Sequence, residues 1–181
     1  MADSTASEAG RNALGPVRPR LPASAEQLRL PLYARSQERM AARWHFDVNA
    51  ADASDRAEGL LAESPSDVDR LLVAAAVRSS RGDDIGALTA ARMAADSDPS
   101  SARAHTTLAA LLAHGGDVAG AARHAQFAVD LDPDDPAALY NRGLTSWSIG
   151  DHRAARADFE RARSILGVDN ASWWRRRRRA G

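Results

Sequence analysis

The sequence contains no cysteine and no lysine, and only 5% of its 181 residues are aromatic. The absence of cysteine excludes disulfide bonds and thiolate metal sites, and it removes one reason to expect an oxidising compartment. With so few aromatic side chains, a core must be built from aliphatic residues and alanine. No apolar run is long enough to span a bilayer and residues 1–20 hold no hydrophobic signal segment, so we expect a cytoplasmic protein.

The motifs of common enzyme chemistries are also missing. There is no glycine-rich phosphate loop, no Gly-x-Ser-x-Gly, no His-Glu-x-x-His and no Gly-x-Gly-x-x-Gly. His114 and His124 flank one turn without a metal-ligand pattern, and His105 occupies a packing position. The acidic stretch 130–135 lacks the glycine and distal glutamate of a calcium loop. We therefore expect no enzyme activity, no cofactor and no bound metal.

A 34-residue repeat is the strongest signal that is present. A Gly-Asp pair recurs at this interval, at 82–83, 116–117 and 150–151. Alanines and prolines keep the same interval: Ala87, Ala121 and Ala155, then Ala94, Ala128 and Ala162, and finally Pro65, Pro99 and Pro133. The interval defines three copies, 68–101, 102–135 and 136–169.

Each copy divides into two apolar-periodic stretches separated by Gly-Asp, which predicts a helical hairpin. The glycine supplies a left-handed exit from the first helix, and the aspartate caps the second. Asp83, Asp117 and Asp151 are therefore predicted N-caps. Asp135 is predicted to cap a helix that has Pro136 in its first position. Ser66, with an acidic residue three positions later, indicates a cap for the helix that follows it.

The stretches LAALLAHGGDVAGAARHAQFAVDLDPDD (108–135) and LYNRGLTSWSIGDHRAARADFERA (139–162) resemble tetratricopeptide repeats. The resemblance covers about 102 residues and implies an all-α fold, an α-solenoid of tandem helical hairpins wound into a superhelix. In that family a small residue and a large apolar one meet in the first helix, and an alanine and an aromatic residue interlock from the second. The small residues here are Ala75, Ala109 and Gly143, and the aromatic residue is Phe159, in the last copy only. Departures from the family pattern are Ala91 and Ala125 for the aromatic residue, Arg142 for leucine and Gly167 for proline.

The ends of the chain differ from the repeats. Residues 1–30 are rich in proline, serine and alanine, so we expect a disordered arm. Residues 31–67 predict helices that form either a degenerate first repeat or an N-terminal cap. Residues 1–46 carry a net charge of +3 and residues 47–169 a net charge of −8. All 24 basic residues are arginine, which in an alanine-rich chain is typical of a GC-rich bacterial genome.

The resemblance implies a function in binding other proteins. First helices of such repeats line a concave groove that holds a peptide or a helix, so we expect a non-catalytic adaptor. The residues placed on or near this groove are Leu72, Val73, Arg103, Thr106, Thr107, Ala110, His114, Tyr140, Asn141, Leu144 and Trp147. Tyr140 and Trp147 are the expected anchors, because large aromatic side chains dominate binding energy when they are desolvated. Packing of Trp147 against the next helix or the C-terminal segment is the alternative.

The last segment, 170–181, ends in SWWRRRRRAG and is not required by the repeats. Its notable residues are Trp173, Trp174, Arg175, Arg176, Arg177, Arg178 and Arg179. Three roles stay open for this tail: a cap docked on the last hairpin, an electrostatic tether to nucleic acid or anionic membrane, or a substrate of a processing or modifying enzyme. The sequence leaves the oligomeric state open as well.

Overall fold

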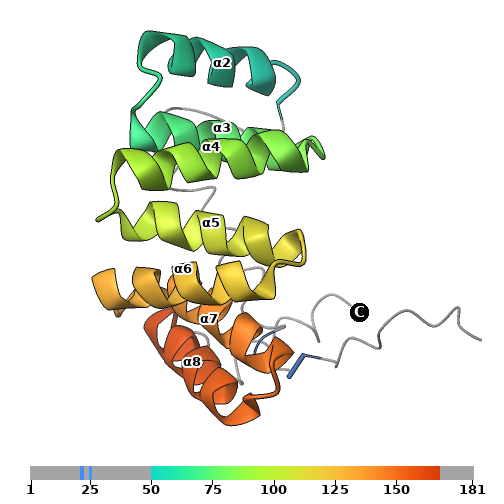
Figure 1. Cartoon of the computed structure of the whole chain (residues 1–181), viewed down its shortest axis with the longest axis vertical. Coiled ribbons are helices and arrows are strands. Elements are labelled where there is room, and N and C mark those ends of the chain that lie inside the picture. The colour runs from blue at the N-terminus through green and yellow to red at the C-terminus, as the bar shows by residue number, and fades with distance from the viewer. Residues whose placement is uncertain (1–20, 23–24, 26–49, 168–181) are drawn as a thin grey trace, which may run out of the picture.

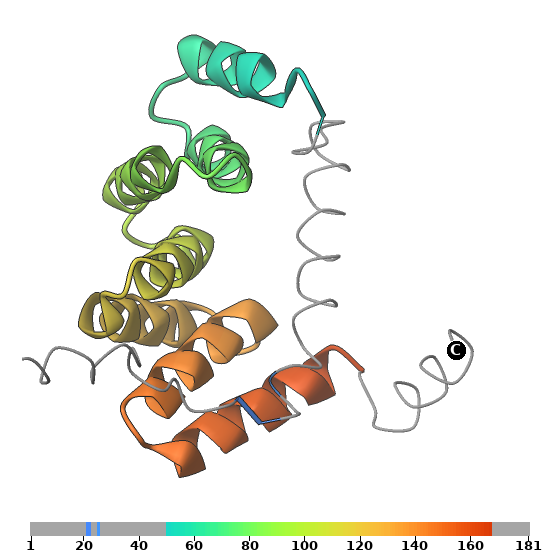
Figure 2. The ribbon, with the colours of Figure 1, turned by 90° about the vertical axis from the view of Figure 1, so that its right-hand side faces the viewer.

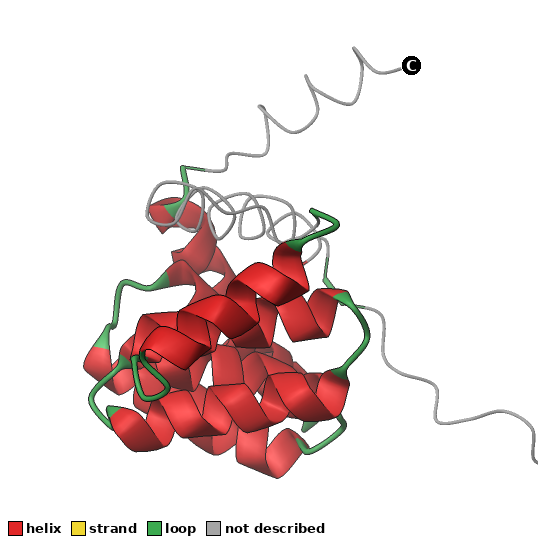
Figure 3. Cartoon of the chain, turned by 90° about the horizontal axis from the view of Figure 1, so that it is seen from above, coloured by secondary structure: helices red, strands yellow, loops and turns green. Residues whose placement is uncertain are grey.

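The structure, a computed structural model, describes residues 21–22, 25 and 50–167. This part of the chain forms seven helices and no strand (Figures 1 and 3). The expectation of an all-α fold is therefore confirmed. The helices are α2 (Ala53–Glu63), α3 (Val68–Ser80), α4 (Asp84–Ser97), α5 (Ala102–His114), α6 (Val118–Leu131), α7 (Pro136–Ser148) and α8 (His152–Ile165).

The helices pack as hairpins, α3 with α4, α5 with α6 and α7 with α8. Successive hairpins pack through α4 against α5 and α6 against α7, and α2 packs against α3. Figure 1 shows the resulting stack, with α2 at one end and α8 at the other. This arrangement is the predicted solenoid, in which a hairpin excludes water only with the help of its neighbours.

The two helices of a hairpin lie on different sides of the stack. Figure 2 shows a curved stack with α3 and α5 on its inner side and α4 and α6 on its outer side. Helix α5 also contacts α3 and α7 directly. We call the side formed by α3, α5 and α7 the inner face, and the side formed by α4, α6 and α8 the outer face.

The hairpin turns confirm the predicted glycine and aspartate roles. Each turn has a glycine with positive φ, which costs glycine little, followed by an aspartate that caps the next helix. The aspartate accepts a hydrogen bond of 2.8–3.0 Å from the amide three residues further on. The pairs are Gly82 (φ 78°) with Asp83, Gly116 (φ 88°) with Asp117, and Gly150 (φ 89°) with Asp151.

The caps of two first helices test the other capping predictions. Asp135 caps α7 and accepts from the amide of Ala137 at 3.0 Å, directly before Pro136, as predicted. The prediction for Ser66 is wrong, because Asp67 caps α3 instead and accepts from the amide of Arg70 at 3.0 Å. Both Ser66 and Asp67 have a side-chain oxygen that can cap a helix, so the sequence alone did not show which of them is the N-cap.

Alanine forms most of the core, in agreement with the composition. The repeated alanines are fully buried, and they let the helices approach closely: Ala87, Ala94, Ala121, Ala128, Ala155 and Ala162. The buried side chains form two clusters. One extends from α2 to the start of α6, and the other joins the end of α6 to α7 and α8.

The last hairpin differs from the others in how it fills its interior. Phe159 on α8 is fully buried and is the largest such side chain in the described part of the chain. A Cβ atom added to Gly143 on α7 would lie 2.6 Å from Phe159 Cε1, so only glycine leaves room for the ring. In the other two hairpins the corresponding second-helix residues, Ala91 and Ala125, are fully buried alanines.

Only parts of the segment before the repeats are described. Helix α2 lies within the predicted range 31–67 and buries Ala53 and Ala57 against α3. Within the expected arm 1–30, residues Leu21, Pro22 and Ala25 are described, and Ala25 is fully buried in the cluster of α6, α7 and α8. The rest of that arm, residues 31–49 and the tail from 168 onward lie outside the described residues.

Candidate functional site

The inner face is built from columns of residues that lie 34 positions apart, one residue from each first helix. The clearest case is Arg103 on α5, whose Nη1 lies 2.6 Å from Asp69 Oδ1 on α3. Both side chains keep some exposure, 49% for arginine and 18% for aspartate. The ion pair therefore joins neighbouring hairpins across the candidate site without removing its charge from solvent.

Helix α5 presents a continuous stripe on this face. Arg103, Thr107, Ala110 and His114 follow the spacing i, i+4, i+7 and i+11, which places them on one side of a helix. Arg103, Ala110 and His114 are exposed, and Thr107 is half-buried. The stripe combines a cation, a hydroxyl group, a small apolar residue and an imidazole, so it offers hydrogen bonds as well as close contact.

Four of the residues placed on or near the groove are buried, namely Leu72, Val73, Thr106 and Asn141. The two polar ones connect neighbouring helices. Thr106 Oγ1 donates to Asp135 Oδ2 at 3.2 Å, and Asn141 Nδ2 donates to the Thr106 carbonyl oxygen at 2.9 Å. These contacts tie α5 to α7, and they leave the α5 stripe and the half-buried part of α7 as the accessible surface.

The accessible part of α7 consists of Tyr140, Leu144 and Trp147, all half-buried. The ring of Tyr140 lies 5.7 Å from that of Phe159, and the ring of Trp147 lies 4.1 Å from that of His152. Both aromatic side chains thus pack against α8, as the alternative for Trp147 proposed. Among the described residues, no acceptor lies within hydrogen-bonding distance of the buried Trp147 Nε1.

A pair of histidines lies between α5 and α6, where the sequence predicted only a packing role for His105. Nε2 of His105 lies 3.0 Å from the carbonyl oxygen of Pro99, which can only accept, so this nitrogen carries the proton. Nδ1 of neutral His105 is then an acceptor for Nδ1–H of His124 at 3.1 Å. Burial first, and then repulsion from His105 when it is protonated and from Arg123 and Arg92, lower the pKa of His124 below its usual 6.5.

The shifted pKa of His124 predicts a pH dependence of stability. Its folded-state pKa is lower than its unfolded pKa, so the unfolded chain binds more protons as pH falls. The contribution of His124 is complete above pH 6.5 and is lost as pH falls from there through the folded-state pKa. We expect the thermal midpoint to fall more between pH 7.5 and pH 5 for the native chain than for His124→Gln. Ala119→Gln gives the control, because it introduces the same side chain at an exposed position of α6 without removing a titratable group and should keep the native pH dependence; equal slopes for all three chains would contradict the prediction.

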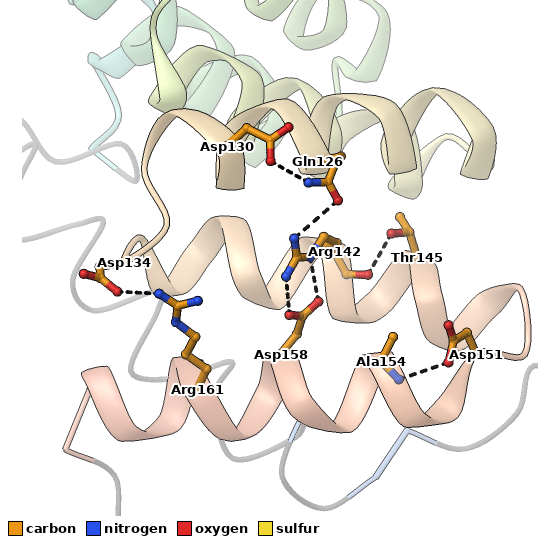
Figure 4. Close-up of polar contacts among 9 residues, drawn as sticks. All are labelled: Gln126, Asp130, Asp134, Arg142, Thr145, Asp151, Ala154, Asp158 and Arg161. Atoms are coloured by element: carbon orange, nitrogen blue, oxygen red, sulfur yellow. Dashed lines mark hydrogen bonds and ion pairs between the residues drawn. The ribbon is translucent and has the colours of Figure 1, made fainter.

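The outer face has an open hollow of about 410 Å³ between α6 and α8, floored by α7. Arg142 lies in its lining and makes two hydrogen bonds to Asp158, of 2.9 Å and 2.6 Å (Figure 4). These bonds raise the pKa of Arg142, so its side chain stays charged. Arg142 also donates to Gln126 Oε1 at 3.3 Å, and Gln126 donates to Asp130 at 2.7 Å.

Sequence reasoning did not identify this outer polar cluster of Gln126, Asp130, Arg142 and Asp158. The available signal was Arg142 itself, since a charged residue at a position usually occupied by leucine needs a partner of opposite charge. Asp158 is buried to 6% exposure on the facing helix and supplies that charge. The guanidinium group is largely engaged within the protein, which makes this cluster a structural element of the last hairpin.

The remaining sequence expectations concern metals, membranes and the tail. No group of three or more potential metal ligands occurs among the described residues. The helices of the described part are all too short or too polar to cross a membrane. The seven tail residues, from Trp173 to Arg179, lie outside the described residues, so their three alternative roles stay predictions from the sequence.

Comparison with a protein-family model identifies the repeats. Residues 86–136 and 115–166 match the tetratricopeptide repeat family, and together they extend from α4 through α8. Residues 86–166 are therefore tetratricopeptide repeats. No curated protein sequence matches the chain significantly.

Solved structures of such repeats share the fold. A crystal structure of MamA is 25% identical, with a TM-score of 0.53, and the match covers 60% of this chain and 64% of that one. TTC0263, a thermophilic TPR protein of Thermus thermophilus, is 20% identical, with a TM-score of 0.58 and coverage of 84% and 96%. The first TPR of Spaghetti (RPAP3), bound to the HSP90 peptide SRMEEVD, is 18% identical, with a TM-score of 0.50 and coverage of 75% and 94%.

Proposed function

We propose that this protein is a non-catalytic, cytoplasmic adaptor of bacterial origin that binds a peptide or a helix of a partner protein on its inner face. The observation that carries the proposal is the α5 stripe from Arg103 to His114, which is exposed although it lies at the centre of the stack. Side chains of this stripe are not needed to cover the core, because Leu108 and Leu112 on the same helix do so.

The chemistry of the inner face suits a segment with both polar and apolar groups. Arg103 and Thr107 offer hydrogen-bond donors near the start of α5, and Ala110 permits close approach of a partner backbone. Leu144 on α7 lies one repeat after Ala110, in the same column, and supplies apolar contact area. The bound peptide of the Spaghetti (RPAP3) structure supports this mode of binding for the fold.

The proposal is tested by placing a photo-crosslinking residue, p-benzoylphenylalanine, at Ala110 in the full chain and irradiating it in extracts of the source cells. A partner held on the inner face should give a discrete adduct, which mass spectrometry identifies. The matched control is the same residue at Ala119, also an exposed alanine, near the start of α6 on the outer face. Leu144→Asp, introduced into the chain that carries the crosslinker at position 110, should reduce partner affinity by about tenfold or more, because a charge then replaces an apolar contact.

An adduct that forms equally from both positions, or that survives Leu144→Asp unchanged, would contradict the proposal. Circular dichroism of each variant tests whether the helices remain. If they do, loss of the adduct is due to the changed inner face and not to unfolding.

A further inference from the structure

The end of the solenoid at α8 carries a contact that the repeats do not explain. Ala25, which precedes the repeats by more than 40 residues, is 0% exposed and belongs to the buried cluster of the last hairpin. Leu21 packs against the same cluster. Figure 2 shows these described N-terminal residues, drawn in blue, beside α8.

The local structure of this segment brings its apolar side chains together. The amide of Ala25 donates to the carbonyl oxygen of Pro22 at 2.9 Å, and Ala25 is helical. Leu21 and Pro22 precede the helical Ala25, and Leu21 and Ala25 both pack against the same cluster.

The surface that receives the segment lies at the end of the stack. On α6, Ala128 and Val129 belong to the same buried cluster as α7, the helix that follows. No hairpin follows α8 in the described part of the chain, yet Phe159 and Ala162 on α8 are fully buried. Leu166, just after α8, packs against the same cluster.

Two further observations favour docking within one chain. The N-terminal part of the chain contacts the stack at both ends, through α2 at one and through Leu21 and Ala25 at the other. Residues 1–46 carry a net charge of +3 and residues 47–169 one of −8, so the N-terminal sequence that contains Leu21 and Ala25 and the solenoid have opposite net charge. A tethered segment also has a high effective concentration, on the order of millimolar for a flexible linker.

We propose that Leu21 and Ala25 form an intramolecular ligand of the last hairpin, held at the end of the inner face. Tyr140, Leu144 and Trp147 pack against the same cluster as Ala25, so release of the segment changes the surface that they offer to a partner. A partner that uses this end of the inner face must displace the segment, and it does so best with the same chemistry, a leucine and an alanine four positions apart in its sequence. This docking adds to the proposed function and does not depend on it.

The test titrates a fluorescently labelled peptide of residues 15–30 with the full chain and follows the anisotropy. Ala25→Asp places a carboxylate in the buried cluster and releases the chain's own segment. We expect this variant to bind the peptide at least about tenfold more tightly than the native chain, whose site is already occupied. The control variant Ala62→Asp, at an exposed alanine of α2, should behave as the native chain does. A peptide that carries Leu21→Asp should not bind to any of the three.

Equal binding to the native and Ala25→Asp chains would overturn the proposal, and so would absence of binding to both. Circular dichroism accompanies each titration. If Ala25→Asp loses helix content, the titration is repeated with the chain variant Leu21→Asp. Loss of helix in both variants would show that the segment is a fixed part of the core and would also overturn the proposal.

Analytical sedimentation tests whether the contact forms within one chain. A native chain that sediments as a dimer, and that Ala25→Asp dissociates, would assign the contact to a second copy and would overturn docking within one chain. The titration contains no partner protein, so its failure leaves the crosslinking result at Ala110 standing, and the reverse also holds.

Discussion

Replacement of Phe159 by alanine should lower the free energy of unfolding by about 3–5 kcal/mol, because it removes a fully buried aromatic ring and leaves a cavity. The ring lies against Gly143, which has no side chain to fill the space, and beside Tyr140. Nearest-neighbour stacking should confine the damage to the last hairpin, so α7 and α8 should unfold at lower denaturant than the rest. Urea denaturation followed by far-ultraviolet circular dichroism measures the effect.

The chain supplies its own control for this prediction. Phe127 on α6 is 54% exposed, so Phe127→Ala removes the same ring from a surface position. Its cost should be within about 0.5 kcal/mol, the range typical of surface substitutions. Similar losses for Phe127→Ala and Phe159→Ala would show that Phe159 does not hold the hairpin together.

Replacement of Asp158 by alanine should cost about 3 kcal/mol, since it leaves the guanidinium group of Arg142 partly buried without its charge partner. Asp158 is 6% exposed and accepts two hydrogen bonds from Arg142, of 2.9 Å and 2.6 Å. The side chain of Arg142 is 26% exposed, and water reaches it in part, which places the expected loss at the lower end of the range for broken buried pairs. Chemical denaturation again provides the measurement.

Two comparisons make this second prediction specific to the ion pair. Arg142→Leu combined with Asp158→Leu should restore most of the lost stability, because apolar residues often replace a buried pair without cost. Asp134→Ala breaks the exposed pair with Arg161, in which the side chains are 78% and 50% exposed, and should cost less than about 1 kcal/mol. If the double variant were as unstable as Asp158→Ala alone, the unpaired charge of Arg142 would not be the cause of the lost stability.

The turns and caps of the repeats could be predicted from sequence because they depend on local backbone chemistry. A glycine that must adopt positive φ and an aspartate that caps the next helix lie next to each other in the chain, as at Gly116 and Asp117. The positions of Gly143 and Phe159 were also identified, because the repeat resemblance implies a small residue in the first helix and an aromatic residue in the second, although it did not pair the two. In each case the positions are fixed by spacing within a single repeat.

The side-chain pairs between helices could not be predicted from the sequence in the same way. His105 and His124 meet because two helices turn particular faces toward each other, and a rotation of some tens of degrees would separate them. The depth of the groove residues depends on the same rotation, which is why Val73 and Asn141 are buried while Thr107 in the same column is half-buried. Periodicity placed these residues near the inner face but gave no measure of their exposure.

The docked N-terminal residues are a third feature that the sequence did not predict. Ala25 contacts a cluster more than 100 residues later in the chain, and its neighbours are polar and proline-rich. Composition therefore predicted an arm without a fixed place, and no repeat pattern extends into it. Contacts of this kind have no signature in spacing, because the receiving surface exists only after the hairpins have stacked.

Binding of partners on the inner face is the claim on which the proposed function depends most. The most direct measurement is the ratio of partner adduct formed from the photo-crosslinker at Ala110 to that formed at Ala119. We expect an adduct from Ala110 that is lost with Leu144→Asp, and none above background from Ala119. A partner that crosslinks from Ala119 and not from Ala110 would place its binding site on the outer face and would contradict this claim.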